Sequence, residues 1–201
     1  GNTVNTSLYG ALKLKYTQKN YIIKSAIEAS YKSENGIQTE ERYIVDIQGN
    51  RYYTDDKSYY SFVGAKFEKN QFSDIELDST YSLGLGKNLY KTEATVLTGE
   101  IGLGYKNTDY VTKGVESKSQ GVGLAKLDLT HKINAQVLFT QDLAISAGEE
   151  QTKTESNTGF KVKVAEKMNL KASYKIRHND KPATGTKKTD TQTILTLIYD
   201  F

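Results

Sequence analysis

The sequence Thr-Asp-Thr-Gln-Thr-Ile-Leu-Thr-Leu-Ile-Tyr-Asp-Phe, residues 189–201, decides the fold class that we expect for this chain. Every second residue counted back from the end is apolar, namely Phe201, Tyr199, Leu197 and Leu195. The alternate positions carry Asp200, Ile198, Thr196, Ile194, Gln192 and Asp190. Successive side chains of a β-strand point to opposite faces, so this alternation predicts a strand with one apolar face.

The end of this strand has a second feature. A chain that stops on Phe after alternating aromatic and aliphatic residues resembles the terminal strand by which bacterial outer-membrane barrels are recognised for insertion. We therefore expect Leu197, Tyr199 and Phe201 to form an insertion signal. Lipid offers no hydrogen-bond partner to an open strand edge, so the rest of the chain should supply further strands and a closed sheet.

The same alternation recurs along the whole chain and predicts eleven strands, each close to the length that a tilted membrane strand needs. Four residues break the pattern: Gln141 falls on the apolar face, and Ile44, Phe62 and Leu138 fall on the polar face. The longest irregular stretch is residues 107–120, and another loop is expected at residues 148–156. The expected strands are residues 7–17, 21–33, 42–53, 59–67, 77–85, 95–105, 123–131, 135–147, 159–165, 170–177 and 189–201.

Composition agrees with one all-β domain over residues 1–201. The chain has 15 Tyr, 16 Gly and 1 Pro, which suits many long strands with few interruptions. No apolar run approaches the roughly 18 residues of a membrane helix. The net charge of +3 is small and the lysines are dispersed, so we expect no nucleic-acid partner. The absence of Cys excludes disulfides and zinc-thiolate sites.

The polar faces of the expected strands are rich in charge. A soluble ligand-binding barrel would alternate as well, and the two readings differ in which face meets water. So many charges on one face, with Tyr repeated at strand ends, favour an antiparallel transmembrane β-barrel with a polar lumen. The charged residues that we expect to line the lumen are Lys13, Lys24, Glu28, Asp46, Lys66, Glu68, Glu100, Lys126, Asp128, Asp142, Lys161, Lys163, Lys171, Lys175 and Arg177.

The strand count suggests that the natural barrel is longer. If Phe201 lies on the periplasmic side, the turn at residues 18–20 is periplasmic and the first strand begins outside the cell. Single-chain bacterial barrels have even strand numbers and both ends in the periplasm. We therefore expect one more strand and a cleaved signal peptide before Gly1, with about twelve strands in all.

Few residues suggest catalysis. His131 and His178 are the only histidines and should lie at opposite ends of the barrel. An outer-membrane lipid-modifying hydrolase would need Ser, His and an acid together, and His178 with Asp180 is the one candidate. The glycines at 84, 86, 102 and 104 are better explained by strand curvature than by phosphate binding. We expect no catalytic residues, no cofactor and no metal, and hence no enzyme.

Several short segments resemble the DUF481 family, described as salt-induced outer-membrane proteins, over essentially the whole chain. This resemblance implies an outer-membrane barrel of uncharacterised activity, with one more strand before the Gly-Asn-Thr segment. It carries over no catalytic residues. The segments are Gly1-Asn2-Thr3, Glu41-Arg42-Tyr43, Phe139-Thr140-Gln141-Asp142-Leu143, Lys187-Lys188-Thr189-Asp190-Thr191 and Tyr199-Asp200-Phe201.

The functional expectation is a monomeric barrel in the bacterial outer membrane. Cations outnumber acids on the expected lumen face, so an open lumen would pass small solutes with a slight preference for anions. Alternatively, the charges pair across strands and fill the interior, which leaves a structural envelope protein. The expected partners are outer-membrane lipid, lipopolysaccharide and, during insertion, the barrel-assembly machinery. A role in salt or osmotic stress follows from the resemblance alone.

Overall fold

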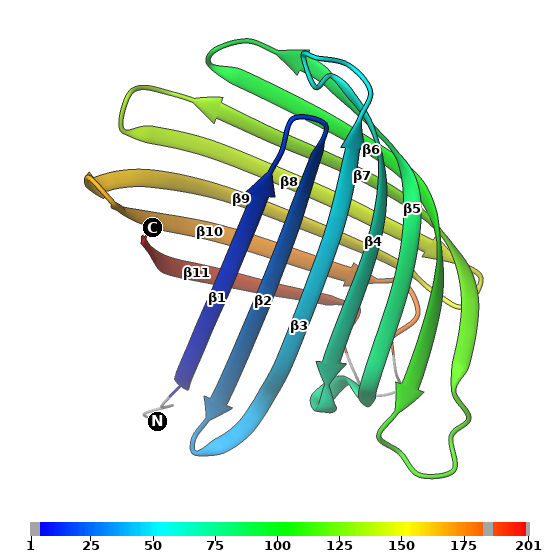
Figure 1. The fold of residues 1–201 in the computed structure, drawn as a ribbon. Helices are drawn as coiled ribbons and strands as arrows, with labels where there is room; N and C mark the ends of the chain where they lie inside the picture. The colour runs from blue at the N-terminus through cyan, green and yellow to red at the C-terminus, as the bar shows by residue number, and fades with distance from the viewer. Residues whose placement is uncertain (1–4, 183–186, 200–201) are drawn as a thin grey trace. The chain divides into compact units, whose positions relative to one another are not determined.

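The fold is built from consecutive hairpins. The computed structural model describes residues 5–182 and 187–199. Over these residues eleven strands form one sheet in the order β1-β2-β3-β4-β5-β6-β7-β8-β9-β10-β11 (Figure 1). Each strand is hydrogen-bonded to its neighbours in sequence, so short turns suffice to connect antiparallel strands.

Each of the eleven segments expected from the sequence corresponds to one observed strand. The count is therefore confirmed for the part of the chain that the structure describes. Only one short helix, the 3₁₀ turn η1 (Gln71–Ser73), accompanies the strands there. The strands are β1 (Asn5–Thr17), β2 (Tyr21–Glu34), β3 (Ile37–Tyr52), β4 (Tyr59–Asn70), β5 (Ile75–Lys91), β6 (Thr95–Tyr110), β7 (Lys118–Lys132), β8 (Val137–Gly148), β9 (Thr152–Ala165), β10 (Met168–Asn179) and β11 (Thr189–Tyr199).

Two of the expected loops were too long. The stretch expected at residues 107–120 is shortened to 111–117, because β6 continues to Tyr110 and β7 begins at Lys118. The stretch expected at 148–156 is shortened to 149–151, because β9 begins at Thr152. A backbone ladder does not require apolar side chains, so strands can extend past the apolar part of their sequence.

The C-terminal strand extends to Tyr199. Phe201, and with it the end of the expected insertion signal, lies outside the described residues. So does the Gly-Asn-Thr segment at residues 1–3. The insertion signal and the additional strand before Gly1 remain predictions.

The chain divides into two compact units. Unit 1 comprises residues 1–84 and 103–122, and unit 2 comprises residues 85–102 and 123–201. Strands β5, β6 and β7 contribute residues to both units. That residues 1–201 form a single domain remains a prediction.

In unit 1, strands β1 to β4 pair antiparallel along most of their lengths, with one irregularity between Lys32 and Ser33. The β2–β3 turn consists of Asn35 and Gly36, with φ values of 52° and 80°. Two consecutive positive φ values match the right-handed twist of a tight hairpin, and Asn-Gly is the pair that adopts them most easily. The β2–β3 connection is therefore a two-residue turn, with Glu34 as the last residue of β2.

In unit 2, strands β8 to β11 pair in the same way, with one irregularity between Met168 and Asn169. Phe139 and Phe160 occupy opposite positions on β8 and β9, and their ring centroids lie 5.2 Å apart. Cross-strand aromatic pairs stabilise a sheet, so this contact helps to set the register that the polar side chains share.

The two faces of the strands differ in exposure as the alternation predicts. On β11, Leu195 and Leu197 are 70% and 61% exposed, whereas Gln192 on the other face is 8% exposed. Exposed apolar side chains recur at alternate positions in most of the strands, from Leu8 and Leu12 on β1 onward. A contiguous apolar surface of this kind is rare in contact with water and typical of a surface that faces lipid.

The four exceptions to the alternation have structural explanations. Ile44 and Phe62 are buried among the polar side chains of the opposite face, where they fill space, and Leu138 is half-buried. Gln141 is half-buried on the apolar face and hydrogen-bonds the hydroxyls of Thr158 and Ser156 on β9. Its amide therefore does not enter an apolar surface with unmade hydrogen bonds, which would be costly.

Candidate functional site

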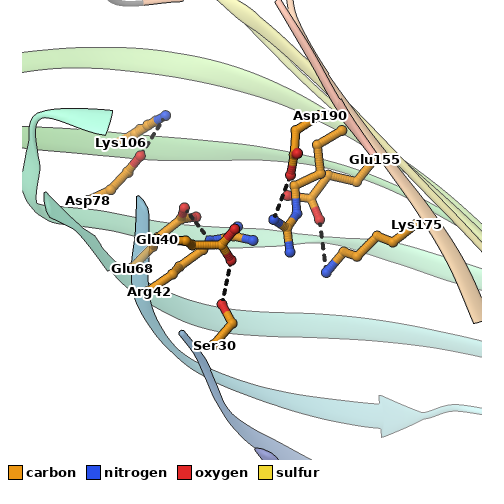
Figure 2. A network of polar contacts seen from close by, with 10 residues as sticks. Ser30, Glu40, Arg42, Glu68, Asp78, Lys106, Glu155, Lys175 and Asp190 are labelled. Atoms are coloured by element: carbon orange, nitrogen blue, oxygen red, sulfur yellow. Dashed lines mark hydrogen bonds and ion pairs between the residues drawn. The ribbon is translucent and has the colours of Figure 1, made fainter. Parts of the chain in front are cut away.

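The candidate site is the polar face of the sheet, which each unit builds differently. In unit 1 the polar face of β3 to β6 holds two buried ion pairs (Figure 2). Arg42 Nε lies 2.8 Å from Glu68 Oε1, and Lys106 Nζ lies 2.9 Å from Asp78 Oδ2. The side chains of both pairs are at most 11% exposed. These charges are neutralised within the protein wall.

The polar face of β3 and β4 is also densely packed. Asn50 is 1% exposed, and its Oδ1 accepts a hydrogen bond of 2.9 Å from Gln48 Nε2. Phe62 lies directly opposite Asn50 in the register, and the neighbouring Tyr60 is 2% exposed. Aromatic rings cover the polar groups here, so this part of the face excludes water.

At the β2–β3 end of unit 1, the acid Glu40 is shared by two donors. Its carboxylate accepts a hydrogen bond of 2.8 Å from the Ser30 hydroxyl and lies 2.8 Å from Lys32 Nζ (Figure 2 shows the Ser30 contact). These residues come from neighbouring strands and are half-buried. This part of the face is polar and partly hydrated.

The polar face of unit 2 is more open. Lys126 Nζ lies 3.6 Å from Glu100 Oε2, and the Lys126 side chain is 34% exposed. Lys175 Nζ lies 3.7 Å from Glu155 Oε2 (Figure 2). A third pair joins Arg177 Nη1 to Asp190 Oδ2 at 3.6 Å. These separations are longer than those in unit 1, and charged groups held this loosely are normally in contact with water.

The structure places the residues expected to line the lumen on these two polar faces. Glu28, Asp46 and Lys66 in unit 1 are half-buried, and Lys13 and Lys24 are exposed. Glu68 and Glu100 are buried in the ion pairs described above. In unit 2, Lys163 and Asp128 are exposed, and the remaining residues are half-buried. Those remaining residues are Lys126, Asp142, Lys161, Lys171, Lys175 and Arg177.

Seven charged residues in these contacts were not among the expected lining residues: Lys32, Glu40, Arg42, Asp78, Lys106, Glu155 and Asp190. Arg42, Asp78 and Lys106 alternate correctly with apolar neighbours, so the sequence pattern could have identified them. Glu155 was assigned to a loop because the start of β9 was placed too late. The choice of partner across strands depends on register, which a single strand's pattern does not contain.

Asp180, which directly follows β10, links the end of this strand to the start of β9 after the 149–151 turn. Its Oδ1 accepts a hydrogen bond of 2.6 Å from the Thr152 backbone amide, and its own amide donates to Thr152 O at 3.1 Å. The Asn179 side chain donates a hydrogen bond of 2.8 Å from Nδ2 to Gln151 Oε1. The Thr152 amide lowers the pKa of Asp180, and nearby Lys181 acts in the same direction.

A similar contact anchors the 111–117 connection in unit 1. The residue that ends η1, Asp74, has a φ of 57°, and its Oδ1 accepts hydrogen bonds from both the amide and the hydroxyl of Thr112. The Val111 amide donates to Asp74 O at 3.3 Å. The connection is thereby held against the β4–β5 turn.

The histidines do not form the acid-base arrangement that hydrolysis would need. His178 Nδ1 lies 2.9 Å from Thr189 Oγ1, whereas Asp180 binds the Thr152 amide. His131 Nδ1 lies 2.8 Å from Thr95 Oγ1 near the β5–β6 turn. Across residues 5–182 and 187–199, no three His, Asp or Glu side chains are grouped so that they could hold a metal ion.

The antiparallel strands, with one apolar and one polar face, define a class: an all-β antiparallel transmembrane barrel. The NanC porin structure, in a rhombohedral crystal form, has this fold; its TM-score is 0.63 at 13% identity, covering 99% of this chain and 97% of that one. The likeness confirms the expected all-β barrel fold. Within the described residues, no helix is long and apolar enough to cross a membrane.

The family can also be stated. Residues 1–201 match the family described as "Protein of unknown function, DUF481", and the chain belongs to this family. The outer-membrane channel DcaP of Acinetobacter baumannii is also similar, with a TM-score of 0.47 at 9% identity over 96% of this chain and 84% of that one. A search of curated proteins finds no significant match.

The buried Arg42–Glu68 pair generates a stability prediction. Glu68→Ala leaves the Arg42 guanidinium buried without its carboxylate and should lower the free energy of unfolding by about 3–5 kcal/mol. The double variant Arg42→Met/Glu68→Leu should lose much less, because it removes both charges and keeps the volume. Urea-induced unfolding in phospholipid vesicles measures both. Glu34→Ala, at an exposed strand end, is the control, and equal losses in single and double variants would contradict the prediction.

The Asp180 contact generates a pH prediction. In the folded protein the pKa of Asp180 lies below its ordinary value of 3.8. The contact between the ionised Asp180 carboxylate and the Thr152 amide therefore stabilises the fold fully above pH 3.8. This stabilisation is lost as the pH falls through the lowered pKa. The protection factor of the Thr152 amide against hydrogen exchange should therefore fall on acidification, and Asp180→Ala should lower it at neutral pH. The Gly148 amide, which donates to Gln151 O, is the internal control. Unchanged Thr152 protection in Asp180→Ala would refute this role.

Proposed function

We propose that this chain is a bacterial outer-membrane β-barrel that serves as a narrow passive pore for small solutes and performs no catalysis. The observation that carries the proposal is the charged, partly exposed face of unit 2 on the opposite side of the strands from an exposed apolar face. Charged side chains that are only partly covered require water, and a barrel whose outside faces lipid offers water only inside. The porin fold shared with the NanC structure supports the same conclusion.

A second candidate is a barrel with a largely filled interior that acts as a structural envelope protein. The buried ion pairs and the packing of Asn50 with Tyr60 and Phe62 in unit 1 favour it. The two candidates differ in whether the charges of unit 2 border a continuous aqueous path. A role in salt or osmotic stress remains a prediction that rests on the earlier resemblance.

The partners in this proposal follow from the environment. Exposed apolar side chains such as Leu103 and Leu195 would contact membrane lipid, and lipopolysaccharide would border the outer ends of the strands. The barrel-assembly machinery would recognise the C-terminal strand, in which Leu197 and Tyr199 lie exposed on the apolar face. We propose a monomer, because the pore lining is supplied by one chain.

The decisive experiment is single-channel recording of the full-length protein, refolded in detergent and inserted into a planar bilayer. Discrete current steps are expected if water fills the lumen. Heat-modifiable migration on a gel and protection from protease in vesicles confirm insertion independently. Inserted barrels that carry no current would reject the pore and favour the structural candidate.

Ion preference is a separate expectation. The triple variant Lys161→Glu, Lys163→Glu and Lys175→Glu should shift the reversal potential in a potassium chloride gradient towards cation preference, because these lysines lie on the polar face of unit 2. A control variant makes the same charge change at Lys19, Lys113 and Lys167, which lie exposed in turns. An unchanged reversal potential in the first variant would contradict the expected lining.

A further inference from the structure

We propose that the apolar face of β2 to β4 carries a binding site for the phosphate group of an anionic membrane phospholipid, built around Arg51. The site lies in unit 1, at the end of the strands that holds the turns 18–20 and 53–58. The inference deepens the proposed function by naming a lipid that the barrel would bind. It rests on the proposed membrane location and does not require an open lumen.

The first observation is that Arg51 lies on the apolar face of the sheet. Its direct cross-strand partners are Tyr21 on β2 and Ser61 on β4. On β2 the same face continues from Tyr21 to the exposed side chains of Ile23 and Ile27. The Arg51 side chain is itself exposed. A charged group that faces lipid is costly unless it reaches the headgroup region or an anionic partner.

The second observation is a set of tyrosines at the same end of this face. The exposed fractions of Tyr16, Tyr21, Tyr53 and Tyr59 range from 39% to 59%. The ring centroids of Tyr16 and Tyr21 lie 6.1 Å apart. Tyrosine has an apolar ring and a polar hydroxyl, so it is favoured where hydrocarbon meets the headgroups. Arg51 therefore lies at the depth in the membrane at which lipid phosphate groups are found.

The third observation is a pair of hydroxyls beside Arg51. The Tyr53 hydroxyl lies 2.8 Å from Ser61 Oγ, and either atom could be the donor. Whichever hydroxyl accepts this hydrogen bond keeps its own proton for a further acceptor. The guanidinium of Arg51 offers a planar fork of donors that matches two phosphate oxygens. The group of donors therefore suits a phosphate.

The fourth observation distinguishes a lipid from a free anion. Gly49 lies two residues from Arg51 on the same face, between Ile23 and Val63 in the register. A Cβ atom added at Gly49 would have only Val63 Cγ2 within 4 Å, at 3.9 Å, so the surface beside Arg51 is open and apolar. A glycine in a strand often marks a place where a ligand approaches the backbone closely. An acyl chain attached to the bound phosphate could pack there.

The surrounding charges favour an anionic headgroup. The neighbours of Arg51 on this face, Tyr21, Gly49, Tyr53 and Ser61, carry no carboxylate that would attract the ammonium of a zwitterionic lipid. The turns at this end contain Asp55 and Asp56 together with Lys19 and Lys57, so the acids there are balanced by cations. Lys57 Nζ donates a hydrogen bond of 3.0 Å to Gln18 O. The positive charge of Arg51 is thus not cancelled on the face itself.

The test is native mass spectrometry of the refolded full-length protein in detergent, titrated with phosphatidylglycerol or with phosphatidylethanolamine. The wild-type protein should bind phosphatidylglycerol saturably and in preference to phosphatidylethanolamine. Arg51→Gln should weaken phosphatidylglycerol binding by about tenfold, because charge-assisted hydrogen bonds to the phosphate are lost. Arg51→Lys should retain part of the affinity, since it keeps the charge and loses the fork of donors. Heat-modifiable migration on a gel shows that each variant is folded.

The matched control is Lys69→Gln. Lys69 is exposed on the same face at the opposite end of unit 1, and its cross-strand partner Tyr43 donates a hydrogen bond of 3.2 Å to the Glu41 carboxylate. Because an acid already lies at that end, this variant should bind phosphatidylglycerol as the wild type does. Equal weakening by Arg51→Gln and Lys69→Gln would show diffuse electrostatic attraction and overturn the site.

A second pair of variants leaves the net charge unchanged. Tyr53→Phe/Ser61→Ala removes the hydroxyl donors beside Arg51 and should weaken phosphatidylglycerol binding several-fold. Tyr31→Phe/Ser33→Ala removes the same two groups at the opposite end of this face and should have no effect. Equal affinities in these two double variants would mean that charge alone attracts the lipid, and the site would be rejected.

Inorganic phosphate separates the two possible sources of the ligand. An excess of it should not displace phosphatidylglycerol, because a free anion does not use the apolar surface beside Gly49. Full displacement would indicate a site for free anions and overturn the lipid assignment.

The outcomes also distinguish this site from the pore. Phosphatidylglycerol binding that depends on Arg51, in an inserted barrel that carries no current, would retain the site and reject the pore. A conducting barrel in which Arg51→Gln binds phosphatidylglycerol as the wild type does would retain the pore and reject the site.

Discussion

The structure depends on the requirement that every backbone N–H and C=O group in the hydrocarbon region has a hydrogen-bond partner. Lipid supplies none, so each strand must be paired along its length. Pairing each strand with its neighbours in sequence meets this requirement with short connections such as Asn35-Gly36. The same requirement applies to side chains that face lipid, and Gln141 meets it through the hydroxyls of Thr158 and Ser156.

The second determinant is the cost of removing charge from water. Unit 1 offsets this cost with short contacts, as in Arg42–Glu68 and Lys106–Asp78, which take up the charges within the wall. Unit 2 leaves its charges partly hydrated, so contacts such as Lys175–Glu155 are long and weak. The polar face is therefore not uniform: its charges are buried and closely paired in unit 1, and partly exposed in unit 2. Any selectivity of a pore would arise mainly from unit 2.

The comparisons with known proteins support the family and the fold, whereas the geometry of the polar face supports the proposed function. The DUF481 family and the likeness to the NanC porin structure establish the family and the fold. Fold alone does not assign a function, because one architecture can serve many. The inference of a pore rests on the positions of this chain's own lysines and acids.

The sequence by itself determined the all-β class, the eleven strands of the described residues and which face of each strand is apolar, because side-chain alternation is a local property of an extended backbone. It did not determine where the polar strands end, since ladder hydrogen bonds continue past apolar residues, as in β6 and β9. Nor did it determine which charges meet. Only the tertiary structure placed Arg42 beside Glu68 and Lys161 opposite Lys171, because register between strands depends on packing across the whole sheet.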